Sequence, residues 1–156
     1  MTSEIRAIGR LLVVVWAFPT TFLGLIFLAL GLLTGGRAKN VGGVLEAHGG
    51  MIATLLDRGP LAKARIAAVT LGHVVLAPNQ SVLDECRVHE RMHVRQCERW
   101  GPLFLPAYAA ESVWAALRGR DPYRDNRFER EARSGARVAL DAGEKPKRLA
   151  EDTVEG

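Results

Sequence analysis

Two histidines and a glutamate lie close together in the segment VHERMHVRQCERWG, which runs from Val88 to Gly101. Their spacing is H-E-x-x-H. In a helix, where successive residues turn by about 100°, the three side chains share one face with apolar neighbours. That face carries Val82, Leu83, Cys86, His89, Glu90, His93, Val94, Cys97 and Trp100, and the opposite face carries Asp84, Arg87, Arg91, Arg95, Glu98 and Arg99. The pattern predicts that the ionisable triplet points into the protein.

An ionisable group among apolar residues is costly unless a partner compensates its charge. A divalent metal ion is one such partner, because two histidines four residues apart on a helix reach the same ion. Glu90 would then act as a general base that takes a proton from a metal-activated water and passes it to the leaving amine. Two alternatives stay open: a hydrogen-bonded histidine pair with Glu90 in an ion pair, and a purely structural metal site.

This segment resembles the HExxH zinc metallopeptidases, specifically the gluzincin branch, in which a glutamate is the third zinc ligand. In membrane-embedded members a later helix carries a pattern like E-x-E-A-D. Here the sequence FEREAR, Phe128–Arg133, is similar, with Arg133 in the place of the aspartate. The stretches TLGHVVLA, HERMHVRQCERWGPLFLPAY and LRGRDPYRDNRFEREAR also resemble a family of small, uncharacterised bacterial proteins of this type, over about Val69 to Arg133.

The resemblance implies a Zn2+ site with a defined set of residues. Its members are His89, His93 and Glu129 as ligands and Glu90 as the general base. Residues two apart on a helix differ by about 200°, so only one of Glu129 and Glu131 can point inward. Glu129 is the first choice and Glu131 the second, and the alternative for Glu129 is a capping role three residues after Asn126. Glu111, in an otherwise apolar segment, is a further candidate for the third ligand.

Four other polar side chains are weaker candidates for the site. His73, in VTLGHVVLA, is expected on a strand, either at the rim of a cleft where an extended substrate adds as a further strand, or as an ordinary half-buried histidine. Tyr108 and Tyr123 could assist an oxyanion, although no pattern singles them out. His48 has no partner at metal-ligand spacing.

The segments around the HExxH helix are expected to form a small sheet and further helices. Glycine pairs bracket Val44–His48, which predicts a short strand, and β-branched residues predict a second strand at Ile66–Leu76. The HExxH helix is expected over about Val82–Trp100, with Ser81 and Asp84 as its start signal. The other expected elements are a helical turn at Met51–Leu56 and helices at Ala107–Leu117 and Arg127–Leu140, the last capped by Asp125 or Asn126.

A charge-free run of 23 residues, Leu11–Leu33, precedes these segments. At about 1.5 Å per residue it is long enough to cross a bilayer core of about 30 Å. It is longer than the apolar part of a signal peptide, and its proline and two glycines are better tolerated in a membrane span than in a soluble core helix. The run therefore favours an uncleaved anchor over a signal peptide or a buried helix. Two basic residues lie on each side, so no orientation is predicted.

The chain accordingly divides into an N-terminal flank (1–10), a transmembrane anchor (11–33), a zincin-like metal-binding domain (34–140) and a disordered tail (141–156). Trp100, Phe104 and Tyr108, near the sequence PLFLP, are expected at the membrane interface. Cys86 and Cys97 would be about 16 Å apart on one helix, too far for a disulfide.

The predicted protein is thus an α+β, minimal zincin-like domain with one N-terminal transmembrane helix, a single-pass protein of the bacterial inner membrane. Its predicted activity is zinc-dependent hydrolysis of peptide bonds at or near the bilayer. The alternatives are a non-catalytic, metal-stabilised scaffold and a protein that binds anionic lipid through its arginines. The helix arginines argue less for nucleic acid, because no aromatic residues interleave them.

Overall fold

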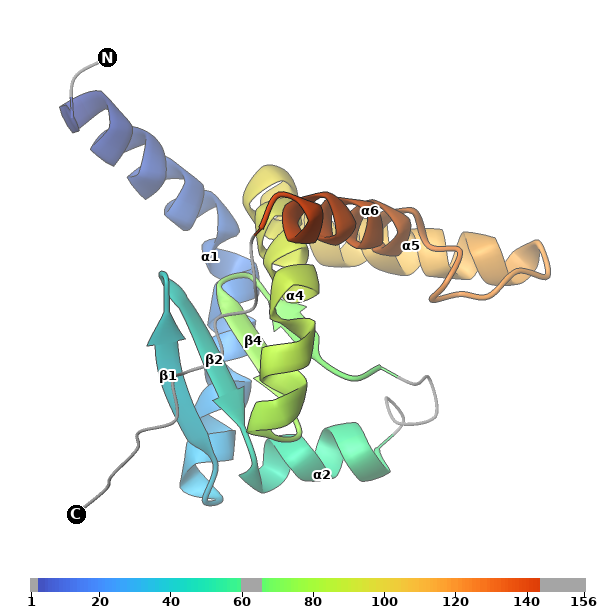
Figure 1. Ribbon diagram of the computed structural model, residues 1–156, viewed down its shortest axis with the longest axis horizontal. Coiled ribbons are helices and arrows are strands. Elements are labelled where there is room, and N and C mark those ends of the chain that lie inside the picture. Colours follow the sequence, from blue (N-terminus) through green and yellow to red (C-terminus); the bar gives the residue numbers. More distant parts are fainter. Residues whose placement is uncertain (1–2, 60–65, 144–156) are drawn as a thin grey trace.

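The structure is a computed structural model that describes residues 3–59 and 66–143 (Figure 1). It has an α+β architecture with one long apolar helix at the N-terminus, as the sequence predicts. The elements are α1 (Ser3–Leu33), β1 (Arg37–Val41), β2 (Val44–His48), α2 (Gly50–Arg58), β3 (Val69–Leu71), β4 (Val74–Ala77), α4 (Gln80–Trp100), a 3-10 turn η1 (Gly101–Leu103), α5 (Phe104–Leu117) and α6 (Arg127–Asp141). The predicted disordered tail, 141–156, lies outside the described residues beyond position 143.

The four strands form one mixed sheet in the order β1-β2-β4-β3. β2 pairs with β4 in parallel, and β1–β2 and β3–β4 are antiparallel. The strand expected at Val44–His48 is confirmed. The single strand expected at Ile66–Leu76 is wrong, because Gly72, at a φ of 62°, turns the chain and makes a hairpin of β3 and β4. β1 has no apolar alternation in its sequence RAKNV, and it was not predicted.

The sheet lies between two helical layers, and β4 divides its side chains between them. Val75 and Ala77 pack towards α4, in a cluster with Leu83 and Val94. Residues of β4 that alternate with these, such as Val74, pack on the other face, against α1 and α2. This alternation is the two-residue period of a strand that is buried on both sides.

α4 begins and ends at residues that fix its place in the sequence. Its N-cap is Asn79, whose side-chain oxygen accepts a hydrogen bond from the backbone N of Val82 at 3.0 Å. The start predicted at Ser81 is therefore wrong by two residues, and Ser81 contacts Glu85 instead. Gly101, at a φ of 55°, ends the helix.

The prediction that Arg87 lies on the solvent face of α4 is wrong. Arg87 is only 8% exposed and Glu46, on β2, only 2%. The Arg87 guanidinium donates through Nε to Oε1 of Glu46 at 2.8 Å and through Nη2 to Oε2 at 2.9 Å. The two parallel hydrogen bonds of this pair compensate both charges in the absence of water.

The aromatic residues expected at a membrane interface pack together within the domain, with Trp100 and Tyr108 half-buried. Phe104 is buried, and its ring centroid lies 5.4 Å from that of Phe128. Trp100 and Tyr108 pack on the same Phe128 ring. This aromatic cluster joins the end of α4 to α5 and α6, the elements that position the site.

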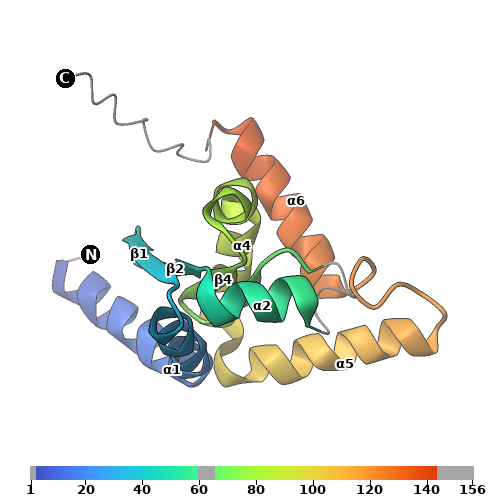
Figure 2. The same ribbon diagram turned by 90° about the horizontal axis from the view of Figure 1, so that it is seen from below.

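α1 is the one described helix that is long and apolar enough to cross a membrane. The stretch Ala7–Leu33 has 27 residues, and an 18-residue window within it has a mean hydropathy of 2.3. A signal sequence or a buried core helix shares these properties. Figure 2 shows α1 and α5 along the lower edge of the molecule, with α6 above α5.

Candidate metal centre

The three predicted ligands come from two helices that pack closely together. His89 and His93 lie one turn apart on α4, and Glu129 lies in the first turn of α6. Small residues allow the helices to approach: Ala132 is fully buried between them, and a Cβ on Gly135 would lie 2.8 Å from Sδ of Met92.

The cap of α6 places Glu129. The Asn126 side chain is fully buried and accepts a hydrogen bond from the backbone N of Phe128 at 2.8 Å. Its amide nitrogen donates to the carbonyl of Tyr108 at 3.0 Å and to Oγ of Ser112 at 2.8 Å, which ties the start of α6 to α5. Because Asn126 does the capping, the Glu129 carboxylate is directed to the histidines.

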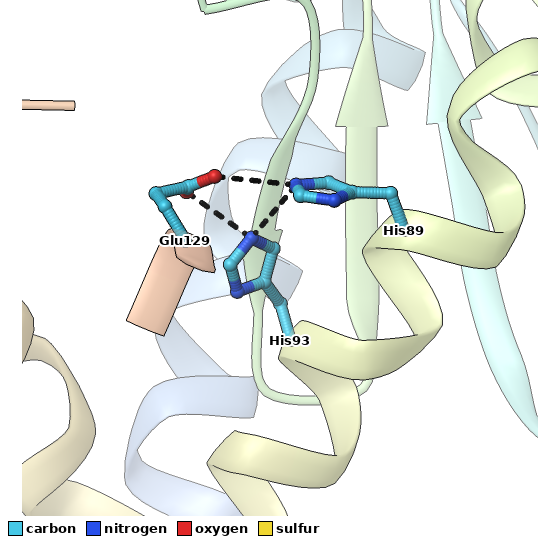
Figure 3. A group of neighbouring side chains, drawn as sticks. All are labelled: His89, His93 and Glu129. Carbon is cyan, nitrogen blue, oxygen red and sulfur yellow. Dashed lines mark hydrogen bonds and ion pairs between the residues drawn. The ribbon is translucent and has the colours of Figure 1, made fainter. Parts of the chain in front are cut away.

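The donor atoms of these three side chains converge on one point (Figure 3). Nε2 of His89 and Nε2 of His93 are 3.1 Å apart. Oε2 of Glu129 lies 3.3 Å from the first, and Oε1 lies 3.2 Å from the second. Ligand atoms that bind zinc tetrahedrally at about 2.0 Å are separated by about 3.3 Å, so the spacing fits such an ion.

One atom of this cluster lacks a hydrogen-bond partner. Among the described residues, Oε2 of Glu129 is the one buried side-chain nitrogen or oxygen for which none is found. Leaving a buried acceptor of a charged group unsatisfied is costly, and it is rare in native proteins. A cation beside Oε2 would compensate it, and two imidazoles with a carboxylate are a donor set that zinc takes.

The pKa values of the metal-free site favour a positive charge between these side chains. Burial opposes ionisation of Glu129, but its contacts with His89, His93 and Tyr108 hold its pKa well below the usual range. Burial would lower the pKa of His93, but the hydrogen bond to Glu129 and the charges of Glu90 and Glu129 raise it above the usual value. Without an ion, the Glu129 carboxylate therefore favours the protonated form of His93.

Gln96 orients His93 and was not predicted. Its Oε1 lies 2.8 Å from Nδ1 of His93, and its amide nitrogen donates to the carbonyl of Phe128 at 3.0 Å. An amide oxygen only accepts, so Nδ1 carries the proton, and the lone pair of the neutral ring is on Nε2, which faces the other donors. The sequence signal was the position of Gln96 three residues after His93 on the same helix.

Glu90 borders a cavity beside the three donors. It is 5% exposed, and its Oε2 accepts a hydrogen bond from Oγ1 of Thr70, on β3, at 2.6 Å. The cavity has a volume of about 220 Å³. Its polar lining is Thr70, Glu90, His93, Tyr108, Tyr123 and Glu129, and the rest is apolar. The predicted base therefore faces the same small space as two of the predicted ligands.

The two tyrosines that the sequence left undecided both line this cavity. The Tyr108 hydroxyl donates to Oε1 of Glu129 at 2.9 Å. Burial and the charge of Glu129 raise the pKa of Tyr108 and of Tyr123 above the ordinary value, so both phenols keep their protons and can donate.

The other ligand candidates lie away from the histidines. Glu131 points outward, 3.2 Å from Nη1 of Arg99. Glu111 lines a separate groove between α5 and α6. Arg133, in the place of the family's aspartate, lies 3.9 Å from Oε2 of Glu129, and its Nη2 donates to the carbonyl of Arg124. Of the three glutamates, the structure brings only Glu129 to the histidines, and its ligand role stays a prediction.

The remaining histidines have structural surroundings. His73 lies in the turn between β3 and β4 rather than on a strand, with Nδ1 3.2 Å from Oγ1 of Thr21 and Nε2 3.1 Å from Oε1 of Glu98. It therefore joins α1 to α4. His48 ends β2 and belongs to no group of potential metal ligands within the described residues.

No family model, no curated protein and no solved structure matches the chain.

Proposed function

We propose that the protein is a membrane-attached, zinc-dependent peptidase of the zincin type. The observation that carries the proposal is the convergence of three donor atoms from α4 and α6, with an unsatisfied carboxylate oxygen, beside a cavity that Glu90 borders. The resemblance of His89–His93 to the HExxH motif supports the same activity. His89, His93 and Glu129 would hold the ion.

The residues of the chain divide the chemistry between them. When bound, zinc supplies a Lewis acid that makes water more acidic and a carbonyl more electrophilic. Glu90 takes the proton of the attacking water and passes it to the leaving amine nitrogen. Thr70 holds one oxygen of Glu90, which leaves the other available for the proton. Tyr123, which lines the same cavity, is the donor for a developing oxyanion.

α1 is the proposed membrane attachment. Its apolar length supports this assignment, and a single pass through the bacterial inner membrane is the form that the sequence predicts. The substrate in this proposal is a peptide or protein that reaches the site at the membrane surface.

Two substitutions test metal binding and catalysis separately. His93→Ala should lose the zinc that the purified wild type carries, about one ion per chain, because one of three protein ligands is gone. Glu90→Gln should keep the zinc and lose at least about 100-fold in cleavage of a peptide library, since the base is removed but no ligand is. Unchanged cleavage by Glu90→Gln, with zinc bound, would contradict the peptidase proposal.

A non-catalytic metal site is the second candidate function, and the burial of the donors favours it. Glu129 is 2% and His93 is 6% exposed, as in the closed sites of structural zinc. Zinc that exchanges slowly with a chelator, together with no cleavage, would support the scaffold. Fast exchange with a metal indicator would support the open site of an enzyme.

A further inference from the structure

The C-terminal half of α1 packs one of its faces on the folded domain. Its buried positions are small, namely Ala17, Thr20, Gly24 and Gly31. A Cβ on Gly24 would lie 2.7 Å from Cβ of Val74, and one on Gly31 would lie 2.4 Å from Cδ1 of Ile52. The helix therefore packs directly on the sheet and on α2, with no room for lipid between them.

The N-terminal half of α1 has charged groups beside it. Gly9, Arg10, Val13 and Val14 line a groove of about 700 Å³ together with side chains of α4. The charged α4 residues in this groove are Arg87, Arg91, Arg95 and Glu98. Placing an arginine at the centre of a membrane costs about 2.5–3.5 kcal/mol on insertion scales. In this fold, α1 cannot be surrounded by lipid along its apolar length.

The outer face of α1 is nevertheless apolar and exposed. A continuous stripe at helical spacing carries six large side chains, each at least 43% exposed. They are Leu11, Val15, Phe18, Phe22, Ile26 and Leu33. Exposed apolar patches of this size mark interaction surfaces in soluble domains.

α5 presents a second apolar stripe. Its exposed residues at helical spacing are Pro106, Ala109, Ala110, Val113 and Leu117. Val113 is 59% and Leu117 is 76% exposed. Glu111, the one acidic residue of α5, lines the groove towards α6, where Arg118 and Arg130 also lie. The exposed stripe of α5 is therefore free of charge.

The two stripes belong to helices on the same side of the molecule, which η1 joins through contacts with both. α1 and α5 lie along the lower edge in Figure 2, with α6 above α5. Exposed arginines lie at the outer ends of both helices, Arg10 in the groove between α1 and α4 and Arg118 in the groove between α5 and α6. The Arg118 guanidinium lies 4.2 Å from the ring centroid of Trp114. Arginines and a tryptophan at the border of an apolar surface suit the anionic headgroup region of a bilayer.

We propose that α1 and α5 form one membrane-binding surface, which lies flat in a single leaflet of an anionic bilayer. Apolar side chains of both helices enter the acyl region, while α4, α6 and their arginines stay in water. This arrangement replaces the single pass predicted from the sequence, and it does not depend on the peptidase proposal. The binding mode is that of an interfacial helix, which lies in the plane of the membrane instead of crossing it.

A pair of introduced cysteines distinguishes the flat arrangement from the crossing one. Ala7 and Ala38 are exposed residues before and after the apolar run. The full-length Ala7→Cys/Ala38→Cys variant is reconstituted in phosphatidylglycerol–phosphatidylcholine vesicles and treated with a membrane-impermeant maleimide. Flat binding gives molecules with two added labels or none in intact-protein mass spectra. A crossing helix gives one label per molecule, which would overturn the proposal. The wild type, treated in the same way, is the control that shows whether the native cysteines Cys86 and Cys97 are labelled.

A matched pair of valines tests the contribution of α5. Val113 on α5 and Val138 on α6 are 59% and 69% exposed, so a tryptophan at either place should leave the fold intact. Each is introduced with Trp16 and Trp114 replaced by phenylalanine, in vesicles that contain brominated lipid, and Trp100, which packs on Phe128, stays as the same background in both variants. The Val113→Trp fluorescence should be quenched at least about twofold more than that of Val138→Trp, because bromine quenches on contact within the acyl region. Equal quenching would remove α5 from the surface.

A second copy of the chain is the competing occupant of the apolar surface. In that case Val113→Trp would be unquenched, and the protein would be a dimer by light scattering in detergent. That pair of results would overturn the proposal. A monomer with quenched Val113→Trp would support it.

Discussion

α4 carries two buried polar clusters that differ in how their charges are balanced. On one side Arg87 meets Glu46 from β2, and both oxygens of that carboxylate accept hydrogen bonds. On another side His89 and His93 meet Glu129 from α6, and one carboxylate oxygen has no hydrogen-bond partner. The first cluster is complete with protein atoms alone. In the second, we propose that a cation completes the contacts of that oxygen, so the comparison is between a structural pair and a proposed binding site.

The largest expected effect is on the complete cluster. Arg87→Met leaves the Glu46 carboxylate buried without its bidentate partner, which should lower the free energy of unfolding by about 3–5 kcal/mol. Chemical denaturation measures it, with Arg95→Met on the exposed face as the control. The double variant Glu46→Leu/Arg87→Met should recover most of the loss. A single variant as stable as the wild type would show that the pair contributes little.

The incomplete cluster should respond to zinc instead. Zinc at about 100 times its dissociation constant should raise the free energy of unfolding of the wild type by about 2.7 kcal/mol, because the ion binds only the folded chain. Glu129→Ala should abolish this gain, and Glu131→Ala, two residues away, should keep it. Thermal unfolding with and without zinc makes the measurement. An equal gain in all three proteins would place the ion elsewhere.

A smaller effect is expected at Gln96, which contacts His93 without belonging to the proposed ligands. Gln96→Leu should weaken zinc binding by about 10–100-fold, since loss of a partner that orients a ligand has this range of effects. Gln80→Leu, at the start of the same helix, is the matched control. Competition with a zinc indicator gives both dissociation constants, and identical values would deny Gln96 an orienting role.

The smallest effect is a pH dependence of the metal-free protein. Because the folded pKa of His93 is raised, its protonation adds stability that is fully present below about pH 6.5 and is lost as the pH rises through the folded pKa. The pKa of Glu129 is lowered, so its contribution is present above about pH 4.5 and is lost only in stronger acid. The zinc-free wild type should therefore lose stability as the pH rises above about 6.5. His93→Gln should lack that decline.

The two clusters also differ in how far the sequence predicts them. The helical period alone placed Glu90 and His93 on the buried face, because both lie within one repeating pattern. The same pattern predicted that Arg87 is exposed to solvent. Its buried partner, Glu46, lies 41 residues earlier, and no residue near Arg87 in the sequence indicates that partner. Burial of a charged residue depends on its partner, and partners distant in sequence leave no periodic signal.

The sheet shows a similar limit. The strand Val44–His48 was predicted because glycines lie at both its ends. Gly72 also lies at a turn, between β3 and β4, but apolar residues on both sides of it made the segment look like one continuous strand. β1 is an exposed edge strand of polar sequence, held by its pairing with β2. Its structure comes from that neighbour and not from its own composition.

Because the three donors come from two helices, they are not all synthesised at the same time. The histidines of α4 leave the ribosome first, and Glu129 follows only after α5 has been synthesised. A nascent chain that ends before α6 offers an ion two nitrogen donors and no carboxylate. The full donor set, and any chemistry that depends on it, therefore comes into being only when the last described helix has been added.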